Sequence, residues 1–234
     1  MLHLAGDHRQ LFVNRRGAGQ TLATYLSKYA GRDDVIVLAL PRGGVPVAYE
    51  VAQALGVPLD LFLVRKLGTP GHRELAMGAI ASGGIRVLNE DVVRWYSIPT
   101  SVIENVVREE QEELQRRERA YREDRPAPDL RNRIVIVIDD GLATGSTMRA
   151  ATQAVRERQP SRVIVAVPVG ARETCAELAA YADEVICARM PEPFVSVGQW
   201  YLDFNQTDDE EVRALLKKSV TTLQKSVTTP QPHR

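Results

Sequence analysis

A run of five β-branched residues that ends in two aspartates constrains this chain more than any other feature. Residues 134–138 read Ile-Val-Ile-Val-Ile, which is typical of a strand buried on both faces of a parallel sheet. Asp139 and Asp140 follow directly, and a loop of small and hydroxyl-bearing residues comes next at 143–147. Residues 148–158 then place apolar side chains at spacings of three and four, which predicts an amphipathic helix. The order of strand, acidic pair, small loop and helix predicts a ligand site.

The loop before this helix has the properties of a phosphate site. The first N–H groups of a helix lack backbone partners and carry partial positive charge, so they attract anions. Gly145 allows close approach of the backbone, while the hydroxyls of Thr144, Ser146 and Thr147 add donors. The two preceding aspartates, once ionised, only accept hydrogen bonds, which suits a vicinal diol or the waters around a metal ion. The expected ligand therefore carries a phosphate at one end and a diol in the middle, as ribose 5-phosphate does.

The stretch Asp139-Asp140-Gly141-Leu142-Ala143-Thr144-Gly145-Ser146-Thr147 resembles the motif with which type I phosphoribosyltransferases bind 5-phosphoribosyl 1-diphosphate (PRPP). The resemblance implies a 5′-phosphate site made of Ala143, Thr144, Gly145, Ser146 and Thr147. It also implies that Asp139 and Asp140 hold the ribose hydroxyls near the developing positive charge and bind Mg²⁺, mostly through water. One departure is Gly141, where the family usually has an aliphatic residue. The alternative is an ordinary strand end with an acidic turn and a helix cap; a Walker loop and a Rossmann fingerprint are both absent.

Alternating strand and helix patterns predict a doubly wound α/β fold with a mostly parallel sheet of about five strands. The expected strands are apolar runs at 35–40, 59–64, 134–138, 162–169 and 184–188. The expected helices lie at 20–29, 46–55, 148–158, 172–181 and 208–218. We therefore expect a single domain over residues 1–218. Residues 219–234, which are rich in Thr, Ser, Gln and Pro, are expected to form a disordered tail.

A second strand-to-helix loop, Pro41-Arg42-Gly43-Gly44, predicts another anion site. By the resemblance, Arg42, Gly43 and Gly44 bind the pyrophosphate of PRPP. The family often holds a cis peptide in this loop, and we expect it here at the Arg42–Gly43 bond. The alternative is a plain strand-to-helix turn.

Two pairs of basic residues are candidates for anion binding outside these loops. Arg65 and Lys66 close the strand at 59–64, and the carboxyl ends of parallel strands face the ligand crevice. We expect this pair to balance the charge of the leaving pyrophosphate. Arg15 and Arg16 are either a further phosphate contact or part of a solvated turn.

Residues 67–78 are rich in Gly and polar side chains, which predicts a mobile loop. By the resemblance this loop is a flap that closes over the site and excludes water, because water competes for the sugar cation. His72 and Arg73 are candidates for reaching the pyrophosphate; a solvated loop is the alternative.

The segment after this flap is expected to depart from the compact members of the family. Residues 77–82 and 85–89 predict a hairpin around Gly83-Gly84. An insert over about 86–131 contains a long, highly charged helix at 99–121. Such a helix is expected to be solvated or to lie between two subunits, so a homodimer is a further expectation.

Residues 190–205 form an irregular segment with four aromatic side chains after the last expected strand. Aromatic rings stack on flat bases. The segment is similar to the base-binding hood of purine phosphoribosyltransferases, although its spacing differs. By this similarity Phe194 or Trp200 stacks on the base, Val195 contributes backbone groups and Asp203 accepts from an amino group. The alternative is a packed C-terminal β-segment.

Charge and composition exclude several classes of function. The 30 basic and 30 acidic residues give a formal net charge of zero, which argues against a nucleic-acid or membrane surface. No apolar run is long enough to span a membrane, and no signal peptide is visible. The four histidines are scattered, and the two cysteines match no zinc spacing, so a zinc site is not expected. Cys175 and Cys187 are expected to be reduced core thiols of a cytoplasmic protein.

The resemblance implies transfer of the 5-phosphoribosyl group from PRPP to a nitrogenous base, with release of pyrophosphate and a purine-like acceptor favoured. One absence matters: many purine enzymes of the family have an aspartate where this chain has Ala143. Glu74 is a possible replacement. The alternatives are a regulatory protein that binds PRPP or a nucleotide without turnover, and an enzyme that cleaves PRPP without a base.

Overall fold

The computed structural model describes residues 2–3, 10–122 and 126–228. A six-stranded parallel sheet forms its centre, in the order β1-β9-β8-β7-β2-β3. The strands are β1 (Leu2–His3), β2 (Val35–Ala39), β3 (Leu59–Leu61), β7 (Ile134–Ile138), β8 (Arg162–Val169) and β9 (Glu184–Arg189). The predicted α/β fold is therefore confirmed; the two-residue strand β1 is an addition that the sequence did not predict.

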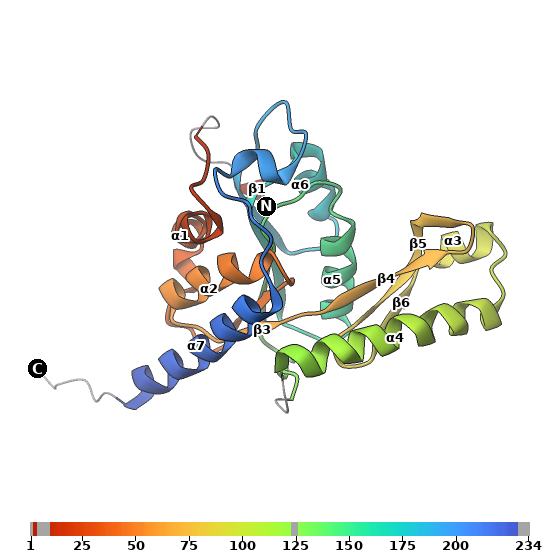
Figure 1. The fold of residues 1–234 in the computed structure, drawn as a ribbon, viewed down its shortest axis with the longest axis horizontal. Coiled ribbons are helices and arrows are strands. Elements are labelled where there is room, and N and C mark those ends of the chain that lie inside the picture. The colour runs from red at the N-terminus through yellow and green to blue at the C-terminus, as the bar shows by residue number, and fades with distance from the viewer. Residues whose placement is uncertain (1, 4–9, 123–125, 229–234) are drawn as a thin grey trace, which may run out of the picture.

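Helices cover both faces of this sheet (Figure 1). One face carries α1 (Arg15–Tyr25), α2 (Gly44–Leu55) and α7 (Asp209–Thr228), and the other carries α5 (Ser146–Arg156) and α6 (Arg172–Leu178). The central strands are buried on both sides, as their continuous apolar runs predict. Successive residues point to opposite faces, so Ile136 packs beneath α2 while Val137 packs beneath α5.

A second, three-stranded sheet extends from the domain as an arm (Figure 1). Its antiparallel strands are β4 (Val64–Thr69), β5 (His72–Ala81) and β6 (Ile85–Leu88). The hairpin predicted around Gly83-Gly84 is confirmed, with positive φ at both glycines. The mobile loop predicted over residues 67–78 is wrong. A tight turn at Pro70-Gly71, with a φ of +78° at Gly71, joins two paired strands there.

Two helices complete the arm: α3 (Glu90–Trp95) and the long α4 (Thr100–Arg122). Ile103 and Leu114 are buried on the inner face of α4, while most of the charged side chains of this helix face solvent. Arg122 anchors the end of the helix, because its guanidinium donates to the carbonyl of Leu61 and lies 3.4 Å from the carboxylate of Asp60. The long charged helix is thus confirmed, and it covers one face of the arm, which the sequence did not predict.

Several element boundaries differ from the sequence predictions, most of all those of α1 and α7. The helix expected at 20–29 begins at Arg15, because the side chain of Asn14 accepts from the N–H of Gly17, and it is followed by a 3₁₀ turn at Ser27–Tyr29. The tail expected from residue 219 is helical as far as Thr228, and 229–234 lie outside the described residues. No described helix is long and apolar enough to cross a membrane.

Candidate active site

The candidate site lies where the order of the parallel strands reverses. Strands β2 and β7 are neighbours, and Ala39 pairs with Ile138 at their carboxyl ends. The chain leaves β2 toward β3 on one side and leaves β7 toward β8 on the other. Ligands of open α/β sheets bind in the crevice at such a point. The loop at 41–44 and the loop at 139–147 both begin there.

Two aspartates follow β7 and use one carboxylate oxygen each within the protein. Oδ1 of Asp139 accepts the backbone N–H of Asp140 at 2.8 Å. Oδ2 of Asp140 accepts Nε of Arg15, also at 2.8 Å. Within the described residues, Oδ2 of Asp139 and Oδ1 of Asp140 have no hydrogen-bond partner. Each carboxylate therefore keeps one acceptor, and a vicinal diol needs two.

The acidic pair is held against an electrostatic cost. Burial raises the pKa of Asp139 well above its usual range, and the charge of Asp140 adds to this rise. Burial also raises the pKa of Asp140, although the charge and hydrogen bond of Arg15 act in the opposite direction. Folding thus keeps two adjacent carboxyl groups where their ionisation is unfavourable, which is common in functional sites.

The loop between the acidic pair and α5 has the shape expected of an anion site. Gly145 stands directly before α5 with a φ of +67°, and a Cβ there would lie 2.5 Å from Cγ2 of Thr174. The hydroxyl of Thr174 donates to the carbonyl of Ala143 at 2.7 Å and fixes the start of the loop. Thr144 and Ser146 bring their hydroxyl oxygens within 3.3 Å of each other. The predicted phosphate-loop residues are therefore gathered at the start of one helix.

Gly141 departs from the family pattern for a steric reason. A Cβ at this position would lie 2.5 Å from Cγ1 of Val197 and 3.1 Å from the carbonyl oxygen of Val169. Val197 begins the 3₁₀ turn η2 (Val197–Trp200) of the 190–205 segment. The missing side chain at 141 therefore lets this segment pack directly on the loop that carries the acidic pair.

The loop after β2 packs against the same aspartates. A Cβ at Gly43 would lie 2.0 Å from Oδ2 of Asp140, and one at Gly44 would lie 2.7 Å from the carbonyl oxygen of Ile138. Only glycine fits at these two positions. The cis peptide expected at Arg42–Gly43 is one bond earlier, at Pro41–Arg42. The sequence indicated the loop but not which of its bonds is cis.

The predicted cations do not all converge on the crevice. Lys66 does, because its Nζ donates to the hydroxyl of Ser146 at 3.2 Å. Arg65 turns to α4 instead, where its Nε donates to Glu110 at 2.6 Å. Arg42 lies 3.6 Å from Asp209 at the start of α7. Both arginines are therefore held by acidic residues of neighbouring helices in this structure.

Sequence reasoning missed Arg117 on α4. It lines a cavity of about 30 Å³ together with Pro41, Arg65 and Thr147, at the edge of the crevice. Its Nε also donates to Glu113 one turn earlier, at 2.7 Å. The sequence contained no local signal for this placement, because Arg117 is one of many charges on α4.

The expected hood residues form a small aromatic cluster. Phe194 and Trp200 are half-buried against Phe12 and Tyr201, whereas Val195 is 70% exposed. Phe204 stacks on Tyr201, with 4.9 Å between the ring centroids. The segment also contains a cis peptide bond, between Glu192 and Pro193.

Asp203 lies apart from the rest of the expected hood. Its Oδ1 accepts the backbone N–H of Asn205 at 3.1 Å. It lines a cavity of about 160 Å³ that also includes Arg15 and Arg16. This cavity is beside α1 rather than among the four aromatic rings.

Arg15 and Arg16, predicted as one basic pair, have different partners. Arg15 contacts Asp140, as described above, and its Nη1 donates to the carbonyl of Asn205 at 2.6 Å. Arg16 contacts α2 instead, where its Nε donates to Glu50 at 2.8 Å. Arg15 therefore belongs to the acidic pair and is not placed as a phosphate ligand.

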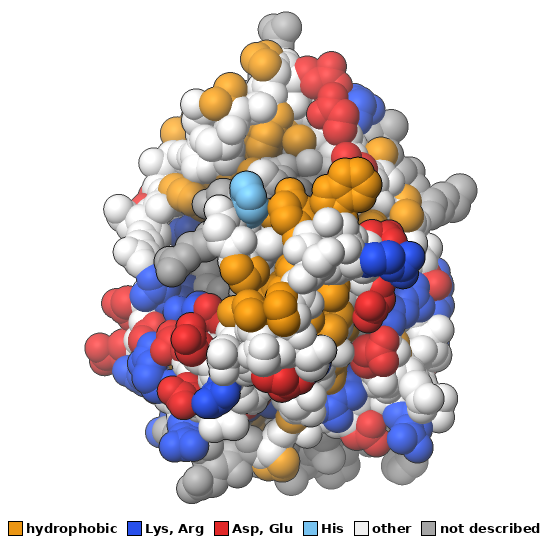
Figure 2. All heavy atoms as spheres, turned by 90° about the vertical axis from the view of Figure 1, so that its right-hand side faces the viewer, with side chains coloured by type: hydrophobic (Ala, Val, Ile, Leu, Met, Phe, Trp, Pro, Cys, Tyr) orange, Lys and Arg blue, Asp and Glu red, His pale blue; other side chains and the backbone are white. Residues whose placement is uncertain are grey.

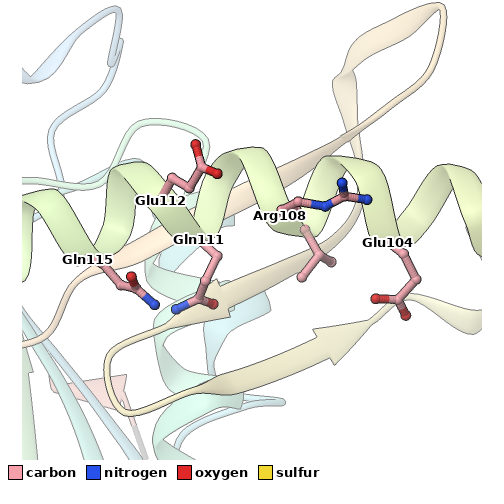
Figure 3. Close-up of a pocket in the computed structure, with 6 residues that line it drawn as sticks. Glu104, Arg108, Gln111, Glu112 and Gln115 are labelled. Carbon is pink, nitrogen blue, oxygen red and sulfur yellow. The ribbon is translucent and has the colours of Figure 1, made fainter.

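Two larger hollows lie outside this crevice. A cleft of about 630 Å³ separates α5 from the arm, and Lys66 and Ser146 stand at its edge beside apolar residues of the arm such as Leu88. A shallow hollow of about 410 Å³ runs along α4 (Figure 3). All residues that line the second hollow belong to one helix, so it provides no opposing wall for a ligand.

The described residues include no group of three or more His, Cys, Asp or Glu side chains that could enclose a metal ion. The two free oxygens of Asp139 and Asp140 fit Mg²⁺, which keeps several waters and binds through one or two carboxylates and substrate phosphates. Zinc, which takes four tightly spaced protein ligands in structural sites, does not fit this donor set.

Comparison with known proteins agrees with this geometry. A model of the phosphoribosyl transferase domain family matches residues 14–205. The "Putative phosphoribosyl transferase Rv0571c" of Mycobacterium tuberculosis is 47% identical over 210 residues, which are 90% of this chain and 47% of that protein. The chain thus spans about half the length of the curated relatives that it matches.

Among solved structures, protein TT1426 of Thermus thermophilus is similar along nearly its whole length. The two are 42% identical, with a TM-score of 0.82, and the match covers 89% of this chain and 99% of that one. The match of the family model includes both crevice loops, the acidic pair and the 190–205 segment. The chain therefore belongs to the phosphoribosyl transferase domain family and has its type I fold.

Proposed function

We propose that this protein transfers the 5-phosphoribosyl group of PRPP to a ring nitrogen of a purine-like base, in nucleotide or nucleoside metabolism. The observation that carries the proposal is the pair of free oxygens on Asp139 and Asp140, between a phosphate loop and a glycine loop. PRPP has a phosphate, a diol and a pyrophosphate in the matching order. In the reaction the base nitrogen bonds to C1 of the ribose. The C1–O bond to pyrophosphate breaks, and its electron pair leaves with the pyrophosphate.

The residues divide the substrate among them. The backbone N–H groups and hydroxyls of residues 143–147 hold the 5′-phosphate, and Lys66 adds positive charge at Ser146. Asp139 and Asp140 hold the ribose hydroxyls and lie near the cationic ribose of the transition state. The glycines at 43 and 44 let the pyrophosphate approach the backbone. Catalysis then comes from placement of the reactants and from charge stabilisation.

The leaving pyrophosphate needs cations of its own, because Lys66 lies at the phosphate loop. Arg65 and Arg117 line the cavity at the edge of the crevice, Arg42 belongs to the loop after β2, and each of the three has an acidic partner. Partly exposed ion pairs of this kind are worth about 0.2–1 kcal/mol, so a pyrophosphate can replace the acidic partners of these arginines. Bound Mg²⁺ supplies further charge at the phosphates, and Asp139 and Asp140 would hold it mostly through water.

Proton transfer has no evident catalyst among the described side chains of the crevice. Ala143 occupies the position where purine enzymes have an acidic residue, and the side chains of Arg73 and Glu74 lie outside the described residues. We therefore propose a base whose reacting nitrogen needs no strong general base. Phe194, Val195, Trp200 and Asp203 are the candidates for contacting it.

A regulatory protein that binds PRPP or a nucleotide without turnover is the second candidate. The observation that favours it is the pairing of Arg42 with Asp209 and of Arg65 with Glu110, which already neutralises the charge of both arginines. A sensor needs the phosphate loop and the acidic pair, but it does not need cations for a leaving group.

We further propose a cytoplasmic homodimer in which each chain forms one domain that includes α7. Figure 2 shows hydrophobic side chains gathered on the face at the free end of the arm. Trp95 is 85% exposed and Tyr96 is 43% exposed, which is uncommon for side chains of this size. Sedimentation velocity tests the dimer, because the proposal predicts twice the mass of one chain.

The cytoplasmic location is favoured by Cys175 and Cys187, which are both free and buried.

Isothermal titration of PRPP with Mg²⁺, repeated with a panel of free bases while pyrophosphate is measured, tests the proposed reaction. A transferase binds PRPP and releases pyrophosphate only when its acceptor base is present. Binding without release from any base supports the regulatory protein instead. Release without any base indicates a PRPP-cleaving enzyme.

A further inference from the structure

Arg15 makes three contacts with two separate segments of the chain. Its Nε donates to Oδ2 of Asp140 at 2.8 Å, and its Nη1 donates to the carbonyl of Asn205 at 2.6 Å. The guanidinium carbon lies 3.9 Å from the centre of the Phe204 ring, which is close enough for a cation–π contact. The side chain is only 11% exposed. Arg15 therefore has a fixed orientation, and its planar guanidinium restricts the orientation of the carboxylate to which it donates.

The contact with Arg15 determines which oxygen of Asp140 remains available. Oδ2 is occupied by the guanidinium, so Oδ1 is the acceptor left for a sugar hydroxyl. A Cβ at Gly43 would lie 3.3 Å from Nε of Arg15 as well as 2.0 Å from Oδ2. The arginine, the carboxylate and the glycine loop therefore fit together with little room for another rotamer of Asp140.

Asp140 is tied to the hood segment a second time, through its backbone. The hydroxyl of Tyr201 donates to the backbone carbonyl of Asp140 at 2.5 Å. Tyr201 stacks on Phe204, which is the ring beneath Arg15. A movement of residues 201–205 would therefore displace both the backbone and the side-chain contacts of Asp140.

We propose that Arg15 is a positioning residue that holds Asp140 in the orientation that reads the ribose diol, and that it couples this orientation to the hood segment. The inference rests on the proposed ribose-binding role of the acidic pair, and it is independent of whether the protein completes the transfer. Arg15 does not touch the sugar in this arrangement. Its effect is measured as the preference of the protein for a sugar phosphate with a 2-hydroxyl over one without it.

Binding of ribose 5-phosphate and 2-deoxyribose 5-phosphate, measured by titration calorimetry, tests the inference without requiring turnover. We expect the unaltered protein to prefer the ribose compound by about tenfold, which corresponds to about 1.4 kcal/mol. In Arg15→Met we expect the preference to fall below about threefold, because Asp140 loses its fixed orientation. Affinity for inorganic phosphate, which reports on the loop at 143–147 alone, should be unchanged.

Arg16→Met is the matched control. Arg16 is the adjacent arginine on the same helix, its side chain is 64% exposed, and it pairs with Glu50 rather than with the acidic pair. The control should keep the full preference for ribose. Loss of preference in both variants would contradict the inference, because a general loss of positive charge would then be sufficient.

Two further variants decide the question if Arg15→Met does not fold. Arg15→Lys keeps the charge but cannot reach Asp140 and Asn205 together, and Phe204→Leu removes the ring beneath the guanidinium. Both should lower the preference for ribose, and an unchanged preference in both overturns the inference. Failure of the unaltered protein to bind either sugar phosphate overturns the proposed function as well, which is a different result from an unchanged preference.

Discussion

The Nε atom of Arg15 lies 2.8 Å from Oδ2 of Asp140, although the two residues are 125 positions apart in the sequence. The contact joins the start of α1 to the loop that follows β7. It also places a positive charge beside two carboxyl groups that burial and mutual repulsion would otherwise disfavour. The acidic pair is therefore a feature of the tertiary structure as much as of the local motif.

Gly145→Ala should weaken binding of PRPP and reduce stability. The positive φ alone costs about 1–2 kcal/mol for a residue with a Cβ, and this Cβ would also meet Thr174 at 2.5 Å. We expect at least a tenfold loss of affinity for PRPP, measured by calorimetry. Gly56→Ala is the control, since Gly56 has a similar φ of +66° but no atom within 4 Å of the point that its Cβ would occupy. An equal loss of affinity in the control would show that strain in the backbone, and not the loop, is responsible.

Gly141→Ala should disturb the hood segment, because its Cβ would lie 2.5 Å from Cγ1 of Val197. We expect the KM for the base to rise more than the KM for PRPP. Val197→Ala removes the colliding methyl groups, so the double variant should recover part of the loss. Residues in contact typically show interaction energies of about 0.5–3 kcal/mol in such a cycle. Strict additivity of the two substitutions would argue against the contact.

Asp139→Asn should stabilise the unliganded fold near pH 7. A carboxyl group whose pKa is raised on folding contributes stability that is fully present below its unfolded pKa and is lost as the pH rises through its folded pKa. Asparagine keeps the Oδ1 acceptor for the N–H of Asp140. It cannot ionise, so the variant does not lose this stability as the pH rises. Each 1 kcal/mol recovered raises Tm by about 2–4 °C in a domain of this size.

Thermal unfolding in EDTA at several pH values measures this effect. The difference in Tm between Asp139→Asn and the unaltered protein should narrow as the pH is lowered toward the unfolded pKa of an aspartate, about 3.9. A variant that is less stable than the unaltered protein at pH 7 would contradict the account of the buried pair.

Glu110→Gln should release Arg65 for the leaving group. The carboxylate of Glu110 accepts Nε of Arg65 at 2.6 Å, and both side chains are about one-third exposed. In a transferase we expect the KM for PRPP to fall, by no more than about fivefold, since pairs of this kind are worth up to about 1 kcal/mol. Glu104 lies on the same helix as Glu110 and forms a similar pair with Arg86 of β6. Glu104→Gln breaks this pair and should leave the kinetics unchanged. If both variants raise the KM equally, Arg65 is not a leaving-group residue.

The sequence predicted the parts of the fold that depend on local patterns. The β-branched run at 134–138 predicted a buried strand because period and composition act within a few residues. Flanking residues then placed the acidic pair and the phosphate loop at its carboxyl end. The hairpin at Gly83-Gly84 was similarly visible, because positive φ at two adjacent positions requires glycine.

The remainder depended on contacts between distant residues. The loop predicted over 67–78 was wrong because its polar composition concealed two paired strands joined at Pro70-Gly71. Gly141 was noticed as an unusual residue, but only Val197 explains it. Arg15 and Arg16 are identical as neighbours in sequence, and their separate roles follow from which of them meets Asp140.

The most direct test of the account is calorimetric titration of PRPP with Mg²⁺ into the unaltered protein and into Asp139→Asn/Asp140→Asn. The double variant keeps the size of both side chains and removes both charges. We predict clear binding to the unaltered protein and a loss of at least about a hundredfold in the variant, while the variant remains folded. Equal affinity of the two proteins would contradict the claim that the acidic pair binds the ribose of PRPP.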